Sequence, residues 1–278
     1  MAFSFTVIFT RIAVDTMSPL FIGAGRAVCA AALAAAALSL TRQALPDRTQ
    51  WWRLAVVGGG VVIGFPLLTS YALVSAPAGH GAMVIALLPA ATAVTAVLRG
   101  REHPPRVFWA AAIAGAVTAI GFASVQGGGI GHLDGSDALL LGAVIAAAVG
   151  YAEGGLLARE LGAWQTVSWA LVLCAPLMTA LAVVAVIREP PSGGVAEWSS
   201  FAYLGVVSMF LGFFAWYRGL AIGPMAQVSQ IQLVQPVLSI CWAALLLREH
   251  VSWSTGVGAV AVIACAGLAV RTRLGTKA

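Results

Sequence analysis

The chain has 278 residues, of which 60% are hydrophobic and only 9% are charged, and its mean hydropathy is +0.95. Ordinary soluble domains carry about a quarter charged residues, so this composition excludes a soluble globular protein and favours one that lies in a lipid bilayer. The net charge of +5 does not indicate a nucleic-acid partner, because the basic residues lie at the ends of apolar segments and form no compact cluster.

Nine runs are long enough to cross a bilayer, which takes about 20 mainly apolar residues. They are 19–40, 54–74, 78–98, 107–125, 138–157, 164–187, 201–221, 225–247 and 251–270. The stretch 3–14 is also apolar, but at about 1.5 Å per residue it spans only about 18 Å of a roughly 30 Å core. It lacks the basic start and the cleavage site of a signal peptide. The links between the runs are short, so no soluble domain is inserted.

An internal repeat accounts for the short first segment. Four features recur in the same order about 147 positions later: Arg11 and Arg159, Tyr71 and Tyr217, Pro89 and Pro236, and the tripeptide Arg-Glu-His at 101–103 and 248–250. This order predicts two repeats, 1–126 and 135–273, of five helices each. The stretch 3–14 then matches the end of the sixth helix, so we expect the first helix to be truncated by about a dozen residues.

Five helices per repeat is an odd number, so the second repeat enters the membrane from the opposite side to the first. The predicted fold is an all-α polytopic membrane bundle of ten transmembrane segments in a 5+5 inverted repeat, a design typical of alternating-access transporters. The loops and ends on the side of the N-terminus hold ten arginine or lysine residues, and those on the other side hold two, Arg188 and Arg248. This bias predicts that both termini are cytoplasmic.

Short motifs follow one another in a fixed order along both repeats. In the first they are Arg11, Ser18-Pro19-Leu20, Arg26, Tyr71-Ala72-Leu73, Ala78-Gly79, Pro89 and Leu98-Arg99-Gly100-Arg101-Glu102. In the second they are 217–221 (Tyr-Arg-Gly-Leu-Ala), Gln235-Pro236 and Leu246-Leu247-Arg248-Glu249. In this order and duplication the chain resembles the EamA-type drug/metabolite transporters over nearly its whole length. The resemblance implies export of amino acids, related metabolites or drugs. The chain departs from the family's pattern in its short first helix and in His80, where many relatives carry an acidic or a small residue.

The segment 225–247 is the most informative about a binding site, because five polar residues lie within nine positions: Gln227, Ser229, Gln230, Gln232 and Gln235. Amides inside a membrane are costly unless they pair or face water. Gln227 and Gln230 share one helix face, which we interpret as a cavity wall, while Gln232 and Gln235 share another. The alternative is that these amides only bond neighbouring helices. The repeat places His80 at the position equivalent to Gln227.

Aromatic residues dominate the preceding segment. Met209, Phe213 and Trp216 form one stripe at helical spacing, and Tyr217 follows. Such a stripe faces lipid or core in many helices, but an apolar, aromatic wall with few polar anchors is also typical of small-molecule sites. The short link to the next segment makes the two helices antiparallel neighbours, so both stripes are predicted to face one central cavity, with Tyr71 across it.

Two ionisable residues lie inside predicted helices. Glu153 is the one acidic residue within a helix, and such a group is a functional candidate by default, here for substrate binding. The alternative is that it pairs with a neighbouring arginine near the cytoplasmic end. Arg26 has no acidic residue nearby in the sequence, so it either supports folding or attracts an anionic group.

Catalytic motifs are absent from the sequence: it has no His-Glu-x-x-His, no Gly-x-Ser-x-Gly and no Walker loop. The four cysteines lack metal-ligand spacing, so we expect neither a metal nor a cofactor. The predicted function is a secondary transporter, not an enzyme, that exports small metabolites, with amino acids preferred, across a bacterial inner membrane. Its expected partners are the substrate and the lipid bilayer, and no oligomeric state is indicated. Alternatives are a multidrug or cationic-compound exporter and, from another class, an intramembrane enzyme or a membrane scaffold.

Overall fold

The computed structural model describes residues 1–100, 102–126, 134–246 and 248, together with Trp253, Val257, Val260, Ala261, Ala264, Cys265 and Leu268. Throughout these residues the regular structure is helical and no strand occurs, as the sequence predicts. The predicted segment 251–270, apart from the single residues named, lies outside the described part of the chain, as do Arg101, Glu249 and His250 of the repeated tripeptides.

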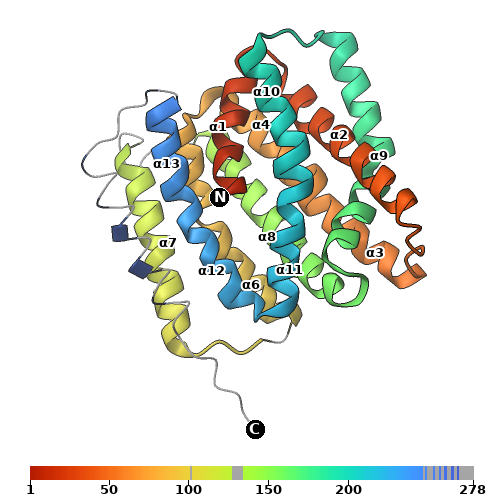
Figure 1. The fold of residues 1–278 in the computed structure, drawn as a ribbon. Helices are drawn as coiled ribbons and strands as arrows, with labels where there is room; N and C mark the ends of the chain where they lie inside the picture. The colour runs from red at the N-terminus through yellow and green to blue at the C-terminus, as the bar shows by residue number, and fades with distance from the viewer. Residues whose placement is uncertain are drawn as a thin grey trace.

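The helices follow one another with short connections (Figure 1). Up to residue 126 they are η1 (Ala2–Phe5), α1 (Thr6–Ala13), α2 (Pro19–Leu40), α3 (Arg48–Val57), η2 (Gly58–Gly64), α4 (Phe65–Ser75), α5 (Ala78–Ile85), α6 (Leu88–Gly100) and α7 (Arg106–Gln126). From residue 135 they are α8 (Gly135–Leu161), α9 (Ala163–Arg188), α10 (Val195–Tyr203), η3 (Leu204–Leu211), α11 (Gly212–Ile222), α12 (Met225–Gln230), η4 (Ile231–Leu233) and α13 (Val234–Leu246).

Six helices of the described chain are long and apolar enough to cross a membrane. They are Pro19–Leu40, Arg48–Ser75, Gly135–Leu161, Ala163–Arg188, Val195–Ile222 and Met225–Leu246. Several combine consecutive elements, since α3, η2 and α4 form one span and α10, η3 and α11 form another. The protein is therefore a multi-pass membrane protein with an all-helical bundle.

Capping residues define where several helices begin. Ser18 accepts a hydrogen bond from the backbone N–H of Phe21 at 3.2 Å, and Pro19 takes the first position of α2, where a missing N–H costs nothing. Asp134 begins α8 with a capping box that it forms with Asp137, whose carboxylate accepts from the Asp134 N–H at 3.1 Å. These polar caps satisfy backbone groups that an apolar helix cannot satisfy itself.

Helix α8 lies at the centre of the bundle, against helices from both halves of the chain (Figure 1). Small residues allow this close packing. A Cβ atom added at Gly60 of η2 would lie 3.0 Å from the backbone N and Cα of Gly150 in α8, so neither backbone leaves room for a side chain there. Tyr217 of α11 is fully buried against the same helix and donates a hydrogen bond to the Gly150 carbonyl at 3.2 Å.

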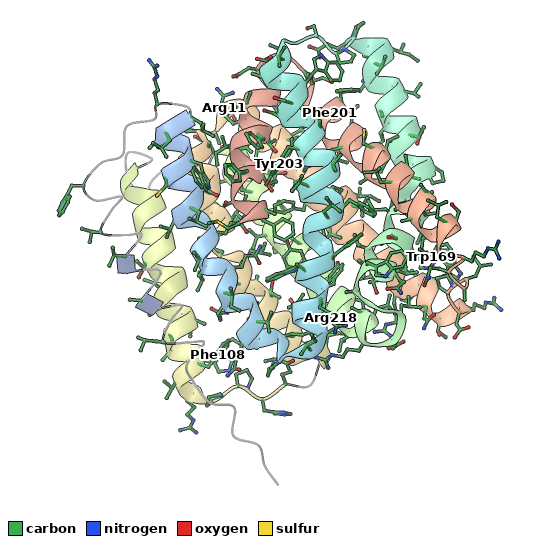
Figure 2. All side chains as sticks on the ribbon, viewed as in Figure 1. Arg11, Phe108, Trp169, Phe201, Tyr203 and Arg218 are labelled. Atoms are coloured by element: carbon green, nitrogen blue, oxygen red, sulfur yellow. The ribbon has the colours of Figure 1, made fainter. Side chains whose placement is uncertain are left out.

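The first helix packs against the aromatic side chains of α10. Tyr203 lies beside the first helices of the chain in Figure 2. It contacts the rings of Phe5 and Phe9 with centroid distances of 5.8 and 4.8 Å, and its hydroxyl donates to the Ala2 carbonyl at 3.0 Å. An interaction across about 200 positions of sequence therefore fixes the start of the chain in the bundle.

Irregular helix geometry occurs at matching places in the two halves. The π-helices η2 (Gly58–Gly64) and η3 (Leu204–Leu211) both lie in the middle of a long span, at positions 147 residues apart for most of their length. The predicted segment 78–98 is not one helix but two, α5 and α6, which meet just before Pro89, and 225–247 is interrupted in the same way by η4. Proline explains the first break, because it lacks an N–H and clashes with the preceding turn.

Substitutions at two adjacent glycines of η2 test the close packing of η2 against α8. We expect Gly60→Ala to lower the melting temperature of the detergent-purified protein, since overpacking a filled core costs about 1–3 kcal/mol. Gly59→Ala is the matched control: apart from its own helix turn, no atom of the described residues lies within 4 Å of the added Cβ, and the change should be neutral or slightly stabilising. Equal melting temperatures for the two variants would contradict the close contact with α8.

Candidate functional site

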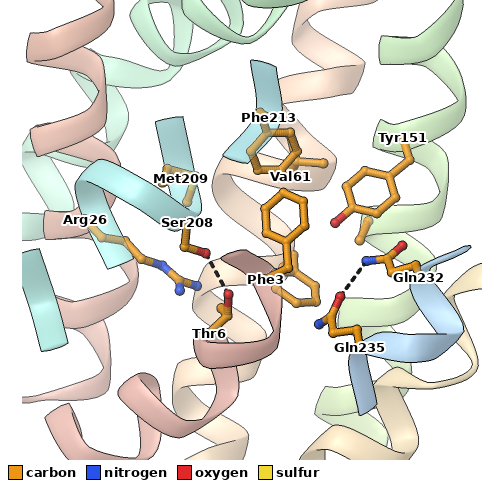
Figure 3. A pocket seen from close by; sticks show the side chains of 12 residues that line it. Phe3, Thr6, Arg26, Val61, Tyr151, Ser208, Met209, Phe213, Gln232 and Gln235 are labelled. Atoms are coloured by element: carbon orange, nitrogen blue, oxygen red, sulfur yellow. Dashed lines mark hydrogen bonds between the residues drawn. The ribbon is translucent and has the colours of Figure 1, made fainter. Parts of the chain in front are cut away.

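A pocket lies where the middle parts of several helices meet (Figure 3). Its empty volume is about 410 Å³, a figure that includes space open to the outside. Both halves of the chain contribute to its wall, which is made by Phe3, Thr6, Arg26, Val61, Phe65, Ala147, Tyr151, Ser208, Met209, Phe213, Gln232 and Gln235. None of these twelve residues is acidic.

Aromatic rings form the apolar part of the wall. Phe3 packs edge-on against Phe213 with ring centroids 5.2 Å apart, and Tyr151 lies 6.0 Å from Phe213. Trp216 stands behind these rings, at 5.2 Å from Tyr151 and 6.3 Å from Phe3. The stripe predicted from the sequence therefore contributes Met209 and Phe213 directly to the pocket, and Trp216 packs against the rings of its wall.

Polar groups lie on both sides of these rings. On one side the hydroxyls of Thr6 and Ser208 share a hydrogen bond of 2.7 Å next to Arg26, and on the other Gln232 donates to Gln235 at 3.0 Å (Figure 3). The Gln232 Oε1 atom is buried and has no hydrogen-bond partner within the described part of the chain. The pocket thus combines ring surfaces with a few directional polar groups, as small-molecule sites do.

Both π-helices supply residues to this wall. Val61 comes from η2, and Ser208 and Met209 come from η3. A π-helical turn holds more residues than an α-helical one, which locally turns side chains to a different face, and such turns are frequent at functional sites. The irregular segments therefore direct side chains toward the pocket that a regular helix would direct elsewhere.

The predicted pair Gln227 and Gln230 lies outside the wall of this pocket. Gln230 is fully buried and donates from Nε2 to the Pro89 carbonyl at 3.1 Å, while Ser229 donates to the same carbonyl at 3.2 Å. Gln227 is half-buried on α12. The other amide pair, Gln232 and Gln235, lines the pocket. The contacts of Gln230 match the alternative interpretation, in which an amide bonds a neighbouring helix.

Three further candidates also lie outside this pocket. His80 of α5 contacts the Asp137 carboxylate of α8, with 2.6 Å between Nε2 and Oδ1. Tyr71 on α4 is 45% exposed, and Tyr217 is buried in the packing of α11 against α8. The substrate-binding role of these residues stays a prediction.

Glu153 belongs to an ion-pair cluster at the helix ends. Its side chain is only 3% exposed and accepts hydrogen bonds from Arg53 of α3 and from Arg99 of α6, the latter at 2.7 Å. Arg53 also bonds Glu160 at 2.5 Å. A carboxylate buried between two guanidinium groups needs no other partner. The contacts of Glu153 therefore match the alternative given above, in which it pairs with neighbouring arginines.

Sequence reasoning did not select Phe3, Thr6, Tyr151 or Ser208 for the site. A usable signal was present in the repeat, because Phe3 and Tyr151 are related by the offset of 148 that also relates Arg11 to Arg159. Val61 and Ser208 are likewise 147 positions apart. In proteins built from inverted repeats the binding site lies at the interface of the two repeats, so pairs of repeat-related residues were candidates for such a site.

Comparison with known proteins agrees with this architecture. The chain is 45% identical over 262 residues to a protein of Bacillus subtilis (strain 168) named uncharacterized transporter YdeK, covering 94% of this chain and 91% of that one. A crystal structure of another protein superposes with a TM-score of 0.74 at 18% identity, over 98% of this chain and 97% of the other, which shows the likeness of the fold. The sequence model of the EamA-like transporter family matches residues 1–124 and, a second time, residues 135–271. Because these two matches span nearly all of the sequence, the chain belongs to the EamA-like transporter family.

Proposed function

We propose that the protein is a secondary transporter that exports small metabolites, amino acids foremost, across a bacterial inner membrane by alternating access. The observation that carries this proposal is the pocket, whose wall contains residues from both halves of the chain at repeat-related positions, such as Phe3 with Tyr151. A site between two repeats becomes accessible from either side when one repeat rocks against the other.

The architecture proposed for this cycle is ten transmembrane segments in a 5+5 inverted repeat, divided as 1–126 and 135–273. The matched π-helices η2 and η3 support it, and so do the matched interruptions near Pro89 and at η4 (Ile231–Leu233). Interrupted helices in corresponding positions of two halves are a frequent feature of transporter binding sites.

Alternating access also requires a barrier on each side of the substrate. Two polar contacts between the halves suit this role, since both involve α8. His80 meets Asp137 near the start of α8, and Arg53 and Arg99 meet Glu153 sixteen residues later, which is about 24 Å along the helix. We propose that the Glu153 cluster closes the cytoplasmic side in the conformation described.

Two tryptophans test the transport role of the pocket. Cells that overexpress the protein should tolerate higher concentrations of at least one toxic amino acid, and proteoliposomes should show flux of that compound. Trp216→Ala should reduce the flux, because it removes the support behind Tyr151 and Phe3. Trp253→Ala, which changes a side chain that is 88% exposed, should leave it unchanged at equal expression. Full flux with Trp216→Ala would count against this pocket, and the absence of any flux would count against transport.

Accessibility of Ser208 tests the proposed barrier. In a variant with its four native cysteines replaced, Ser208→Cys introduces a thiol at the pocket wall. We expect added Glu153→Gln to raise labelling of this thiol by a membrane-impermeant maleimide from the cytoplasmic side several-fold, since the neutral amide no longer holds both arginines. Glu160→Gln is the matched control, because Glu160 also bonds Arg53 but is 47% exposed at the helix end. Identical labelling of the two variants would argue against a barrier at Glu153.

The charge bias of the loops predicts the orientation. A reporter that is active only in the cytoplasm should be active when fused at Ala278, because arginine and lysine are retained on the cytoplasmic side. A reporter that is active only in the periplasm should give no signal at the same position. The opposite pair of results would reverse the proposed orientation and, with it, the side on which the Glu153 cluster lies.

A further inference from the structure

Arg26 of α2 is a buried cation for which the described part of the chain supplies no acidic partner. Its side chain is 1% exposed, and none of the ion pairs formed within the described part of the chain includes it. Its hydrogen bond to protein runs from Nη2 to the Thr69 hydroxyl at 3.4 Å, and its Nε atom has no partner among the described residues. The guanidinium therefore keeps most of its hydrogen-bonding capacity unused.

Other arginines of this protein, unlike Arg26, pair with carboxylates. Arg53 and Arg99, for example, each bond the buried carboxylate of Glu153. Burying a guanidinium without a counter-charge is strongly unfavourable, so proteins retain such a group where a charge from outside compensates it or where function requires it. The absence of a carboxylate around Arg26 in the described chain thus indicates a ligand that brings the missing negative charge.

The position of Arg26 directs this charge into the pocket. Arg26 is one of the residues that line it, beside the hydrogen-bonded hydroxyls of Thr6 and Ser208 (Figure 3). Thr69 donates its own proton to the Phe65 carbonyl at 2.6 Å, so its oxygen is left to accept from Arg26. Thr69 consequently holds the guanidinium in place without neutralising it.

A second unpaired group lines the same pocket across the aromatic rings. The amide of Gln232 is fixed by its bond to Gln235, and no described residue donates a hydrogen bond to its buried Oε1 atom. A buried acceptor of this kind is costly unless a ligand donates to it. Phe3, Phe213 and Val61 lie between Arg26 and the two glutamines in Figure 3, so an apolar surface separates the two unpaired groups.

We propose that Arg26 binds a carboxylate of the transported compound and that Gln232 Oε1 accepts a hydrogen bond from a donor group on the same compound. The rings of Phe3 and Phe213 contact its apolar body. This assignment rests on the proposed transport function and narrows its substrates to small carboxylates that carry an N–H or O–H donor, of which zwitterions are the simplest. Compounds whose only charge is positive are disfavoured, because they would approach a buried guanidinium.

The test measures melting temperatures of the full chain in detergent with each of the twenty protein amino acids as probes. At least one should raise the melting temperature, whereas its methyl ester and its decarboxylated amine should not, since neither has a carboxylate. Arg26→Gln should weaken binding of that amino acid about tenfold or more, the loss expected for a charged hydrogen bond. Arg218→Gln, which changes an exposed arginine of α11, should keep the full response.

The ligand-free protein gives a readout that a structural arginine would not. Arg26→Gln should melt at the same temperature as the unchanged protein or above it, because the variant removes an uncompensated charge. Gln232→Leu should weaken binding of the amino acid. It should not weaken binding of the corresponding acid without the amino group, because that acid has no donor for Gln232. A lower melting temperature for Arg26→Gln with an unchanged ligand response would make Arg26 a structural residue and overturn the proposal.

Failure of this proposal is distinguishable from failure of transport. If none of the amino acids stabilises the protein, or if the ester stabilises it as well as the acid does, the carboxylate site is wrong. Flux that Arg26→Gln leaves unchanged would keep the transport function and reject the site. Stabilisation that depends on Arg26 without flux in proteoliposomes would keep the site and reject the transport function.

Discussion

In a lipid bilayer backbone polar groups must be satisfied within the protein and an unpaired side-chain group is costly, and the arrangement of this bundle depends on that constraint. The break between α5 and α6 shows how it acts. Pro89 interrupts the helix, and its carbonyl accepts bonds from Ser229 and Gln230 of α12, the helix that is interrupted at the matching place in the other half. These bonds join the interrupted segment of one half to the interrupted segment of the other.

The same constraint separates the structural polar groups from those available for a ligand. Glu153 satisfies both of its oxygens with arginines, and Tyr217 satisfies its hydroxyl with the Gly150 carbonyl. Six buried side-chain atoms have no hydrogen-bond partner among the described residues, and two of them, Arg26 Nε and Gln232 Oε1, belong to residues that line the pocket. A membrane protein gains nothing in stability from leaving these groups unpaired, so their location in one cavity is an argument about function rather than folding.

Sequence patterns predicted more of the fold than of the site. Hydropathy located the long spans, and α2 covers the same residues, Pro19–Leu40, as the predicted segment. Periodicity separated the two amide faces of the segment 225–247 correctly but did not determine which of them turns to the pocket, because apolar neighbours surround both. Gln232 and Gln235 line the pocket. A 3-10 turn at Ile231–Leu233, which the sequence pattern does not predict, begins between this pair and the pair Gln227 and Gln230. The π-helices escaped prediction for the same reason, since helical periodicity assumes a regular turn.

Duplication supplies a symmetric backbone, and substitution makes the pocket chemically asymmetric. At the repeat-related positions of the wall, Phe3 of the first half corresponds to Tyr151 of the second, and Val61 corresponds to Ser208. The second half therefore carries a hydroxyl at two positions where the first half is apolar. The charge has the opposite distribution, because the offset of 148 relates Arg26 to Cys174, which is buried away from this wall. A symmetric pocket would bind a molecule equally in two orientations. A cation from one half and amides from the other define a single orientation, which a transporter needs if it is to distinguish the two ends of a small substrate.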